Sequence, residues 1–212
     1  VTFIDNHDLP RFLSIRNDPA RFRMANLLIM TVRGVPCIYY GSEQLLHDDT
    51  AGGNDPYNRP MMTSFDETPL VRDLATLAAL RRRSPAVQRA GMRSKWLEAD
   101  RWVFTRPYRG SCVLVGVNRA DHACEMGVEG LELPDGVHVD CLGGPSLEVR
   151  EGRACVKVPA RGLVVYEHTV PVPEGRTVVD HQVHGIRPRP GEDVFECGDA
   201  PEIGGWDVTR AV

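Results

Sequence analysis

The sequence lacks any long hydrophobic run and any excess of charge of one sign. None of its apolar stretches approaches the roughly 20 residues that a membrane-spanning helix needs, so we expect no membrane partner. Lysine and arginine number 25 against 29 aspartate and glutamate, which leaves a formal net charge of −4 and a pI near 6.0. Such a balance provides no broad attraction for nucleic acid or an anionic surface. We therefore expect no nucleic-acid partner either.

Signal-peptide features and paired cysteine motifs are also missing. The sequence starts with Val1 rather than methionine, and neither a basic nor an apolar leader segment follows. The six cysteines have no Cys-x-x-Cys spacing, and a chain of this length does not require disulfides, although an even number would permit them. We expect most to be buried free thiols, and the redox compartment stays open. They are Cys37, Cys112, Cys124, Cys141, Cys155 and Cys197.

Residues 1–84 have the pattern of a parallel α/β fold. With 42% hydrophobic residues, the chain can bury a core, and collagen-like or wholly disordered classes are excluded. Residues 1–4 and 35–40 are short apolar runs that we predict to be strands, the second buried on both faces. Residues 18–34 and 70–83 carry apolar positions at helical spacing. Alternating strands and helices predict a parallel sheet with crossover helices.

Residues 85–168 follow a different pattern, in which short apolar runs alternate with Gly, Pro and Asp turns. This pattern predicts an antiparallel β-sandwich. The predicted strands are residues 102–105, 112–118, 137–141, 154–158 and 163–167. Residues 169–178 are rich in proline and glycine and predict a linker, after which another β-unit begins.

The most informative motif is the segment at residues 3–8, Phe-Ile-Asp-Asn-His-Asp. Burying Asp5, His7 and Asp8 at the end of a strand is costly unless they bond to one another or to a polar ligand. In a parallel α/β barrel, such strand ends form the active site. The alternative is an Asx-rich turn that caps the following helix. From the residues alone, the two interpretations are equally good.

The same segment, with Arg11 and Phe12 after it, resembles the fourth conserved region of the α-amylase superfamily of glycoside hydrolases. Residues 33–36 and 38–44 resemble that family's eighth barrel strand and its exit. The resemblance implies a fold of class α/β plus all-β. Residues 1–86 would be the C-terminal part of a (β/α)8 TIM barrel, and residues 87–168 the family's antiparallel β-sandwich. We therefore expect the 212 residues to be a piece of a longer enzyme.

The resemblance implies roles for His7 and Asp8. Asp8 matches the family's third acidic residue, which bonds the sugar hydroxyls of the −1 subsite, and His7 matches a histidine that donates to the same sugar. In a retaining glycosidase such contacts strengthen as oxocarbenium character develops, and they lower the barrier by several kcal/mol. Both residues are therefore predicted to stabilise the transition state.

A third motif, residues 52–59, resembles the Asp-Pro-x-Asn-Arg loop of cyclodextrin glycosyltransferases and their closest α-amylase relatives. It implies that Asp55 and Arg59 clamp a glucose farther along the donor side. The planar guanidinium of arginine can hold such a geometry beside a carboxylate. The alternative is a turn stabilised by a surface ion pair.

The last segment, residues 179–212, resembles the opening of a family-20 starch-binding module, incomplete here. The resemblance implies that Trp206 stacks on a glucose face, since a flat apolar ring suits the C–H face of a pyranose. The alternative is a tryptophan in the core of a β-sandwich. We expect starch or a related α-glucan as the partner.

Two carboxyl groups across the scissile bond are essential to a retaining mechanism. The family's nucleophile and acid/base match nothing in these residues, so we expect the isolated 212-residue polypeptide to be inactive. The resemblance implies a starch-active α-amylase-type hydrolase of α-1,4 bonds, in carbohydrate metabolism. Cyclodextrin glycosyltransferase activity is the alternative, disfavoured because the stretch after Glu167 is too short for the β-domain usual in those enzymes. A non-catalytic glucan-binding protein is a third possibility, if these residues are the whole product.

The resemblance further implies secretion and no cofactor in this segment. The family's calcium sites lie mostly in parts that this chain does not match, and no EF-hand loop is present. His181 and His184 could be metal ligands, but no Cys or acidic cluster joins them at zinc spacing. We therefore predict no metal site here.

Overall fold

A four-stranded antiparallel sheet separates two apolar cores in the computed structural model, which describes residues 1–171. Its strands lie in the order β1-β2-β3-β8, and two further strand pairs are β4-β7 and β5-β6. The bounds are β1 Arg93–Leu97, β2 Arg101–Tyr108, β3 Ser111–Asn118, β4 Cys124–Val128, β5 Gly136–His138, β6 Leu147–Val149, β7 Ala154–Val158 and β8 Gly162–His168. All these pairings are antiparallel.

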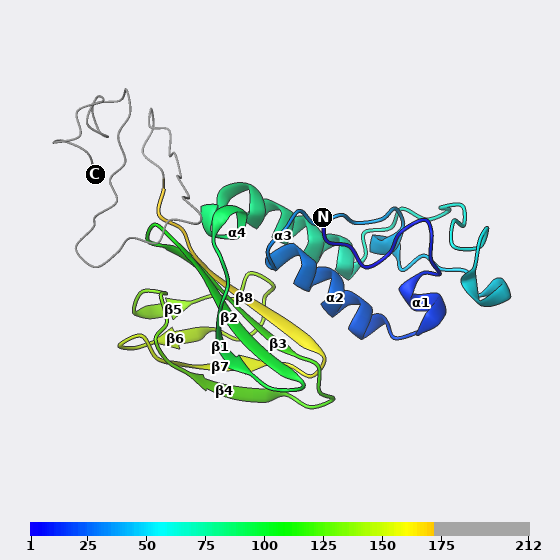
Figure 1. Ribbon diagram of the computed structural model, residues 1–212. Helices are drawn as coiled ribbons and strands as arrows, with labels where there is room; N and C mark the ends of the chain where they lie inside the picture. The colour runs from blue at the N-terminus through cyan, green and yellow to red at the C-terminus, as the bar shows by residue number, and fades with distance from the viewer. Residues whose placement is uncertain (172–212) are drawn as a thin grey trace, which may run out of the picture. The chain divides into compact units, whose positions relative to one another are not determined.

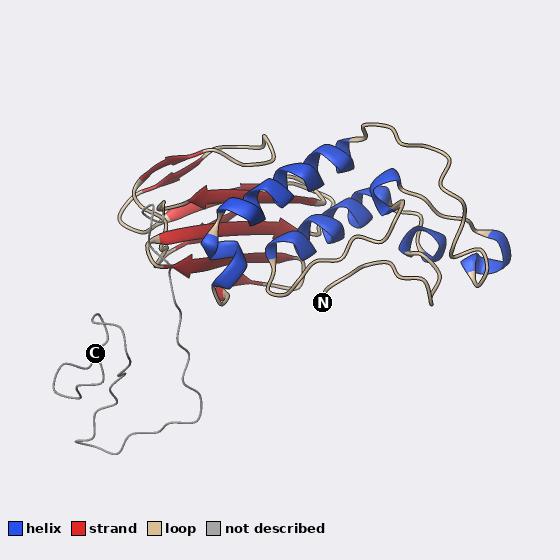
Figure 2. Ribbon diagram, turned by 90° about the horizontal axis from the view of Figure 1, so that it is seen from above, coloured by secondary structure: helices blue, strands red, loops and turns tan. Residues whose placement is uncertain are grey.

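Helices cover one face of this sheet (Figure 1). The α-helices are α1 Phe12–Ile15, α2 Pro19–Thr31, α3 Pro69–Arg83 and α4 Pro85–Arg89, and two short 3₁₀ turns are Ser42–Gln44 and Thr50–Gly53. Seen from above, α2 and α3 run side by side over the strands (Figure 2). In the described part of the chain, no helix combines the length and apolarity needed to cross a bilayer.

The two long helices begin where the sequence predicts, because each has a capping side chain followed by proline. The Asp18 side chain accepts a hydrogen bond from the backbone N–H of Arg21 at 3.1 Å, and Thr68 Oγ1 accepts one from Val71 at 3.1 Å. Such caps satisfy N–H groups that lack a partner within the helix. The three arginines that end α3 complement its dipole.

Strand β3 is buried along its whole length, which explains its unbroken apolar sequence. Val113, Val115 and Val117 pack in the core shared with the helices, whereas Cys112 and Leu114 pack in the second core, with β4, β6 and β7. Side chains alternate between the faces of a strand, so both faces here are covered. The helices and the sheet share a core, and residues 1–171 form one compact unit. The boundary at residues 86 and 87 and the β-sandwich class stay predictions.

The prediction of regular strands at residues 1–4 and 35–40 is wrong. The two segments do run parallel, but they share one isolated bridge, between Thr2 and Pro36. Two backbone hydrogen bonds support it, from Thr2 N to Val35 O at 2.9 Å and from Cys37 N to Thr2 O at 2.8 Å. Val35 is 67% exposed, so the expected burial on both faces is also absent. Parallel strands are stable mainly where both faces are covered, and these are not.

Candidate functional site

The motif at residues 3–8 divides its polar side chains between buried support and exposed surface. Asp5 is buried, and its Oδ1 accepts from Phe12 N at 2.8 Å while its Oδ2 accepts from Ser42 Oγ at 3.0 Å. Asn6 Oδ1 accepts from the backbone N–H of Asp8 at 3.0 Å, as in an Asx turn. The Asx-turn alternative therefore describes Asn6, and Asp5 supports the start of α1.

His7 and Asp8 project from this turn into solvent. Their side chains are 65% and 69% exposed, and His7 Nε2 lies 3.1 Å from Asp8 Oδ1. His7 and Asp8 are therefore not buried at the end of a strand. An exposed imidazole and carboxylate, already paired, can bond a ligand without first being desolvated by the protein.

The loop at residues 54–60 carries the second pair of predicted site residues. Arg59 Nη2 donates to Asp55 Oδ1, and the two side chains are 46% and 63% exposed. Backbone hydrogen bonds from Tyr57 N to Asn54 O at 2.7 Å and from Arg59 N to Pro56 O at 3.1 Å shape the loop. The ion pair fits the alternative of a surface turn as well as a sugar clamp, since exposed pairs contribute little stability.

A buried amide joins the two loops. Asn58 is completely buried, and its Nδ2 donates to the backbone oxygen of His7 at 2.8 Å. His7 and Asp8 are therefore brought together with the loop that presents Asp55 and Arg59, although the two loops are about fifty positions apart in the sequence. The sequence contained this amide within the third motif, but nothing in its pattern indicated burial.

Arg11 is the second buried link, and it joins three segments. Its Nε donates to Asn58 O at 3.1 Å and its Nη1 donates to Tyr40 O at 2.9 Å. The guanidinium carbon lies 4.6 Å from the ring centroid of Tyr39 and 4.8 Å from that of Tyr40. Burial and the neighbouring Tyr40 raise the pKa of Tyr39, and together they outweigh the opposite effect of Arg11. Tyr39 therefore stays neutral beside the cation.

The four predicted site residues that the structure describes, His7, Asp8, Asp55 and Arg59, are all exposed. Two hollows elsewhere in the described part, of about 800 and 380 Å³, lie on the sheet strands. Neither His7, Asp8, Asp55 nor Arg59 lines them. Within residues 1–171, no group of three or more His, Cys, Asp or Glu side chains could hold a metal ion. Trp206 lies outside the described residues, as do His181 and His184.

Comparisons with known proteins relate the chain to a family. A model of the α-amylase catalytic domain matches residues 1–105. The cyclomaltodextrin glucanotransferase of Klebsiella oxytoca is 31% identical over 241 residues, covering 100% of this chain and 37% of that protein. That of Geobacillus stearothermophilus is 41% identical over 147 residues, covering 68% of this chain and 20% of that protein.

The chain belongs to the α-amylase superfamily. One solved structure similar to this chain is that of CldA, a cyclomaltodextrin glucanotransferase with a three-domain ABC distribution. It has a TM-score of 0.74 and 38% identity, covering 80% of this chain and 36% of CldA. An Anoxybacillus α-amylase, with a TM-score of 0.70 and 24% identity, shares the fold and covers 81% of this chain and 38% of the α-amylase.

The chain spans 37% of the length of the Klebsiella oxytoca enzyme and 20% of the length of the Geobacillus stearothermophilus enzyme. The family assignment made from the three motifs is thus confirmed. Roles for the individual residues, the domain boundaries and the starch-binding module stay predictions. The sequence already indicated that Asp5, if buried, would need polar partners, and it has them in Phe12 and Ser42. Sequence reasoning missed Arg11 and Asn58 as side chains that hold the site, because their importance depends on burial and not on residue type.

Proposed function

We propose that this chain forms the substrate-holding side of an enzyme that acts on α-1,4-linked glucans with retention of configuration. The observation that carries the proposal is the hydrogen bond from Asn58 to the His7 backbone at 2.8 Å. It joins the loop of the exposed His7–Asp8 pair to the loop of the exposed Asp55–Arg59 pair. Carboxylate, imidazole and guanidinium groups on adjoining loops are what a neutral, hydroxyl-rich ligand requires for several simultaneous hydrogen bonds.

In this proposal Asp8 and His7 contact the sugar at the bond that is cleaved. Asp8 accepts hydrogen bonds from ring hydroxyls and His7 donates one. Both contacts shorten as the ring flattens toward the oxocarbenium-like transition state, so they lower the barrier more than they tighten substrate binding. The nucleophile and the acid/base would come from the part of the enzyme that this chain does not match. The isolated 212-residue polypeptide is accordingly proposed to be inactive.

Asp55 and Arg59 hold a glucose residue farther along the donor side. Arg59 Nη2 already donates to Asp55, so one rotation of either side chain frees groups for sugar hydroxyls at small cost in an exposed pair. Uniform binding of this kind affects KM more than kcat. The two pairs therefore have different kinetic roles within one surface.

Transfer to a sugar hydroxyl is favoured over hydrolysis. The relatives with at least 30% identity considered above are named cyclomaltodextrin glucanotransferases, whereas the Anoxybacillus α-amylase is 24% identical. The short stretch after Glu167 favoured hydrolysis because glucanotransferases usually carry a further β-domain. CldA is a glucanotransferase with a three-domain distribution, so a short stretch after Glu167 does not count against transfer. Starch binding through Trp206 and an extracellular location belong to the same proposal, and family membership is their support.

Product analysis tests the proposal. The complete reading frame that contains this chain is expressed, and the purified enzyme is incubated with soluble starch. We expect cyclic oligosaccharides at early times, with few new reducing ends. Linear maltooligosaccharides from the outset would instead assign a hydrolase, and no product at all would leave a glucan-binding protein. In parallel, reducing-sugar release by the 212-residue polypeptide, abolished by His7→Ala, would contradict the proposed inactivity of this chain alone.

A further inference from the structure

Arg11 is a completely buried cation that ties its own segment to two others around the candidate site, those of Tyr39–Tyr40 and of Asn58. We infer that Arg11 is a positioning residue, which holds the His7–Asp8 turn and the Asp55–Arg59 loop in one fixed arrangement. The inference rests on the proposed function for its kinetic consequence. Its structural content, that one guanidinium sets the relative position of the two loops, stands on the contacts of Arg11 and Asn58.

Only the shape of a guanidinium suits these contacts. Nε and Nη1 donate to carbonyl oxygens of two different segments, those of Asn58 and Tyr40, at 3.1 and 2.9 Å. The same planar group lies against the Tyr39 and Tyr40 rings, at 4.6 and 4.8 Å from their centroids. A lysine ammonium is a point charge without this planar fork, so it cannot reproduce the two divergent hydrogen bonds and the stacking together.

The link from Arg11 to the substrate-facing side chains is short. Asn58 accepts from Arg11 through its backbone oxygen and donates to His7 O through its side chain. Asn58 directly precedes Arg59, and His7 directly precedes Asp8. A shift of the guanidinium would therefore move both pairs through bonded neighbours. Tyr40 strengthens the connection, since its hydroxyl donates to Pro60 O at 3.0 Å, at the end of the same loop.

The chain contains a matched control in Arg106. This arginine is also buried, at 1% exposure, and it also donates to backbone carbonyls, those of Thr31, Val32 and Ala90 at 2.6–3.0 Å. Arg106 lies in β2, and its bonds join this strand to the end of α2 and to Ala90 after α4, with no bond to either loop. Arg106→Lys therefore reproduces the general cost of disturbing a buried arginine without disturbing the candidate site.

The experiment compares Arg11→Lys with Arg106→Lys by two readouts. In the 212-residue chain, we expect millisecond hydrogen exchange of the Tyr57 and Arg59 amides to rise about tenfold in Arg11→Lys, because local opening becomes easier. In Arg106→Lys the rise is expected at Val32 instead, whose N–H donates to Leu28 O. In the complete enzyme, kcat is expected to fall about 10- to 100-fold for Arg11→Lys alone, as a displacement near 1 Å can cause.

Every outcome of this comparison either supports or overturns the positioning role of Arg11. Equal loop exchange and equal kinetic loss in the two variants would overturn the inference, since Arg11 would then be an ordinary buried residue. If Arg11→Lys does not fold, Asn58→Ala removes the bond to His7 while keeping the backbone oxygen that Arg11 contacts, and the same results are required of it. If the wild-type enzyme does not act on starch, the proposed function fails, and the exchange readout alone supports or overturns the positioning role.

Discussion

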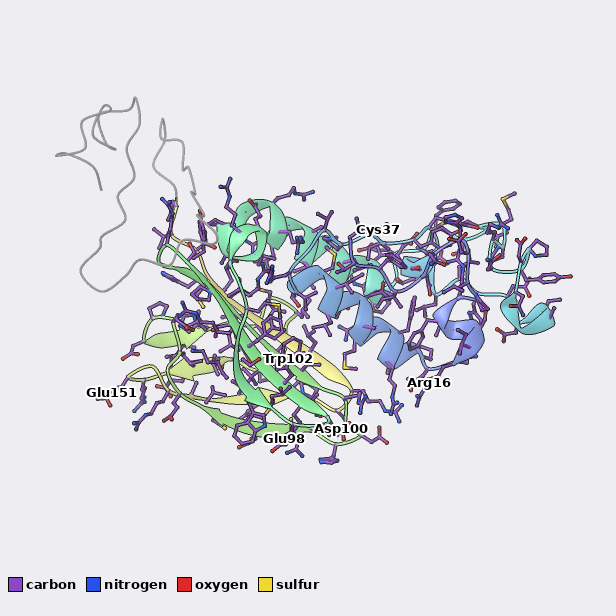
Figure 3. The ribbon with its side chains drawn as sticks, viewed as in Figure 1. Arg16, Cys37, Glu98, Asp100, Trp102 and Glu151 are labelled. Carbon is purple, nitrogen blue, oxygen red and sulfur yellow. The ribbon has the colours of Figure 1, made fainter. Side chains whose placement is uncertain are left out.

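The loop part, residues 1–60, and the sheet part, residues 93–168, are held together by different kinds of hydrogen bond. In the loop part, single side chains such as Asp5, Arg11 and Asn58 bond to groups 7 to 51 positions away. In the sheet part, the hydrogen bonds form between the backbones of paired strands. The β2–β3 pairing is uninterrupted, from Arg101 opposite Asn118 to Tyr108 opposite Ser111. Figure 3 labels Arg16 and Cys37 in the loop part. It labels Glu98, Asp100 and Trp102 in the sheet part.

This difference teaches where the chain can expose polar side chains in fixed positions. A ladder shares its hydrogen bonds among many residues, so no single side chain determines its geometry. A loop fixed by a few buried polar side chains depends on each of them, because an unsatisfied buried partner is costly. The loop part can thus present His7, Asp8, Asp55 and Arg59 to solvent, but its geometry is vulnerable to single substitutions.

The largest effect is expected in the core that the two parts of the fold share. Phe104 is fully buried in the core that contains residues of α2, α3 and β3. Phe104→Ala should lower the free energy of unfolding by about 3–5 kcal/mol, through lost burial and the cavity left behind. Urea denaturation measures it, with Leu97→Ala as the control at a 71% exposed position of the sheet. A loss below about 1 kcal/mol would contradict the shared core.

The next effect separates support from surface within one motif. Asp5→Ala leaves the Phe12 N–H and the Ser42 hydroxyl without their acceptor, so we expect a loss of about 1–3 kcal/mol. Asp8→Ala removes an exposed carboxylate and should change stability by less than about 0.5 kcal/mol. Thermal unfolding of the two variants gives the comparison. Equal losses would show that the motif does not divide its residues between these roles.

A smaller effect tests electrostatics in the sheet part. Burial opposes ionisation of Glu132, but hydrogen bonds from Thr105, Lys95 and Arg93 outweigh it and hold the pKa of Glu132 below its ordinary value of 4.5. A lowered pKa in the folded state adds stability above pH 4.5, which is lost as the pH falls through the folded-state pKa.

Glu132→Gln should therefore destabilise the protein by about 1 kcal/mol at pH 7 and by progressively less below pH 4.5. Urea denaturation across this pH range measures the difference. The control is Glu125→Gln, an exposed carboxylate paired with Lys157, for which the change should be smaller at every pH. A Glu132→Gln penalty that grows toward acid pH would reverse the sign and contradict the assignment.

The smallest expected effect is a difference in how fast the cysteine thiols of the two parts are alkylated. All five cysteines in residues 1–171 are free, of which Cys37 and Cys155 are exposed and Cys112 is buried. Burial raises the pKa of Cys112 to about 12, so its reactive thiolate is scarce at pH 8. Iodoacetamide should modify Cys37 first and leave Cys112 intact until unfolding, as peptide mass spectrometry would detect. Early labelling of Cys112 would show that the sheet part opens in the native state.

Regular elements with strong local signals could be predicted from the sequence. Helix α2 follows from Asp18 and Pro19, and β7 matches its predicted range because its apolar residues alternate. Strands β1 and β4 escaped prediction because charged residues and a glycine interrupt them. Their pairing with β2 and β7 is a tertiary effect that overrides weak local preference.

The candidate site was only half predictable, for a related physical reason. His7, Asp8, Asp55 and Arg59 carry chemistry that a motif can display, and these were found through the family resemblance. Arg11 and Asn58 act through burial and through bonds to distant backbone atoms. No local pattern indicates which arginine or asparagine the fold will bury, since that depends on how distant segments meet.

The central claim is that the loop part presents transition-state contacts for an α-glucan, and Asp8 tests it most directly. The measurement is kcat/KM on soluble starch for the complete enzyme and its Asp8→Asn variant, with Asp49→Asn as the control at another exposed carboxylate of the loop part. We predict a loss of about 100-fold for Asp8→Asn at unchanged melting temperature, and no loss for the control. Full activity in Asp8→Asn, or an equal loss in both variants, would contradict the account.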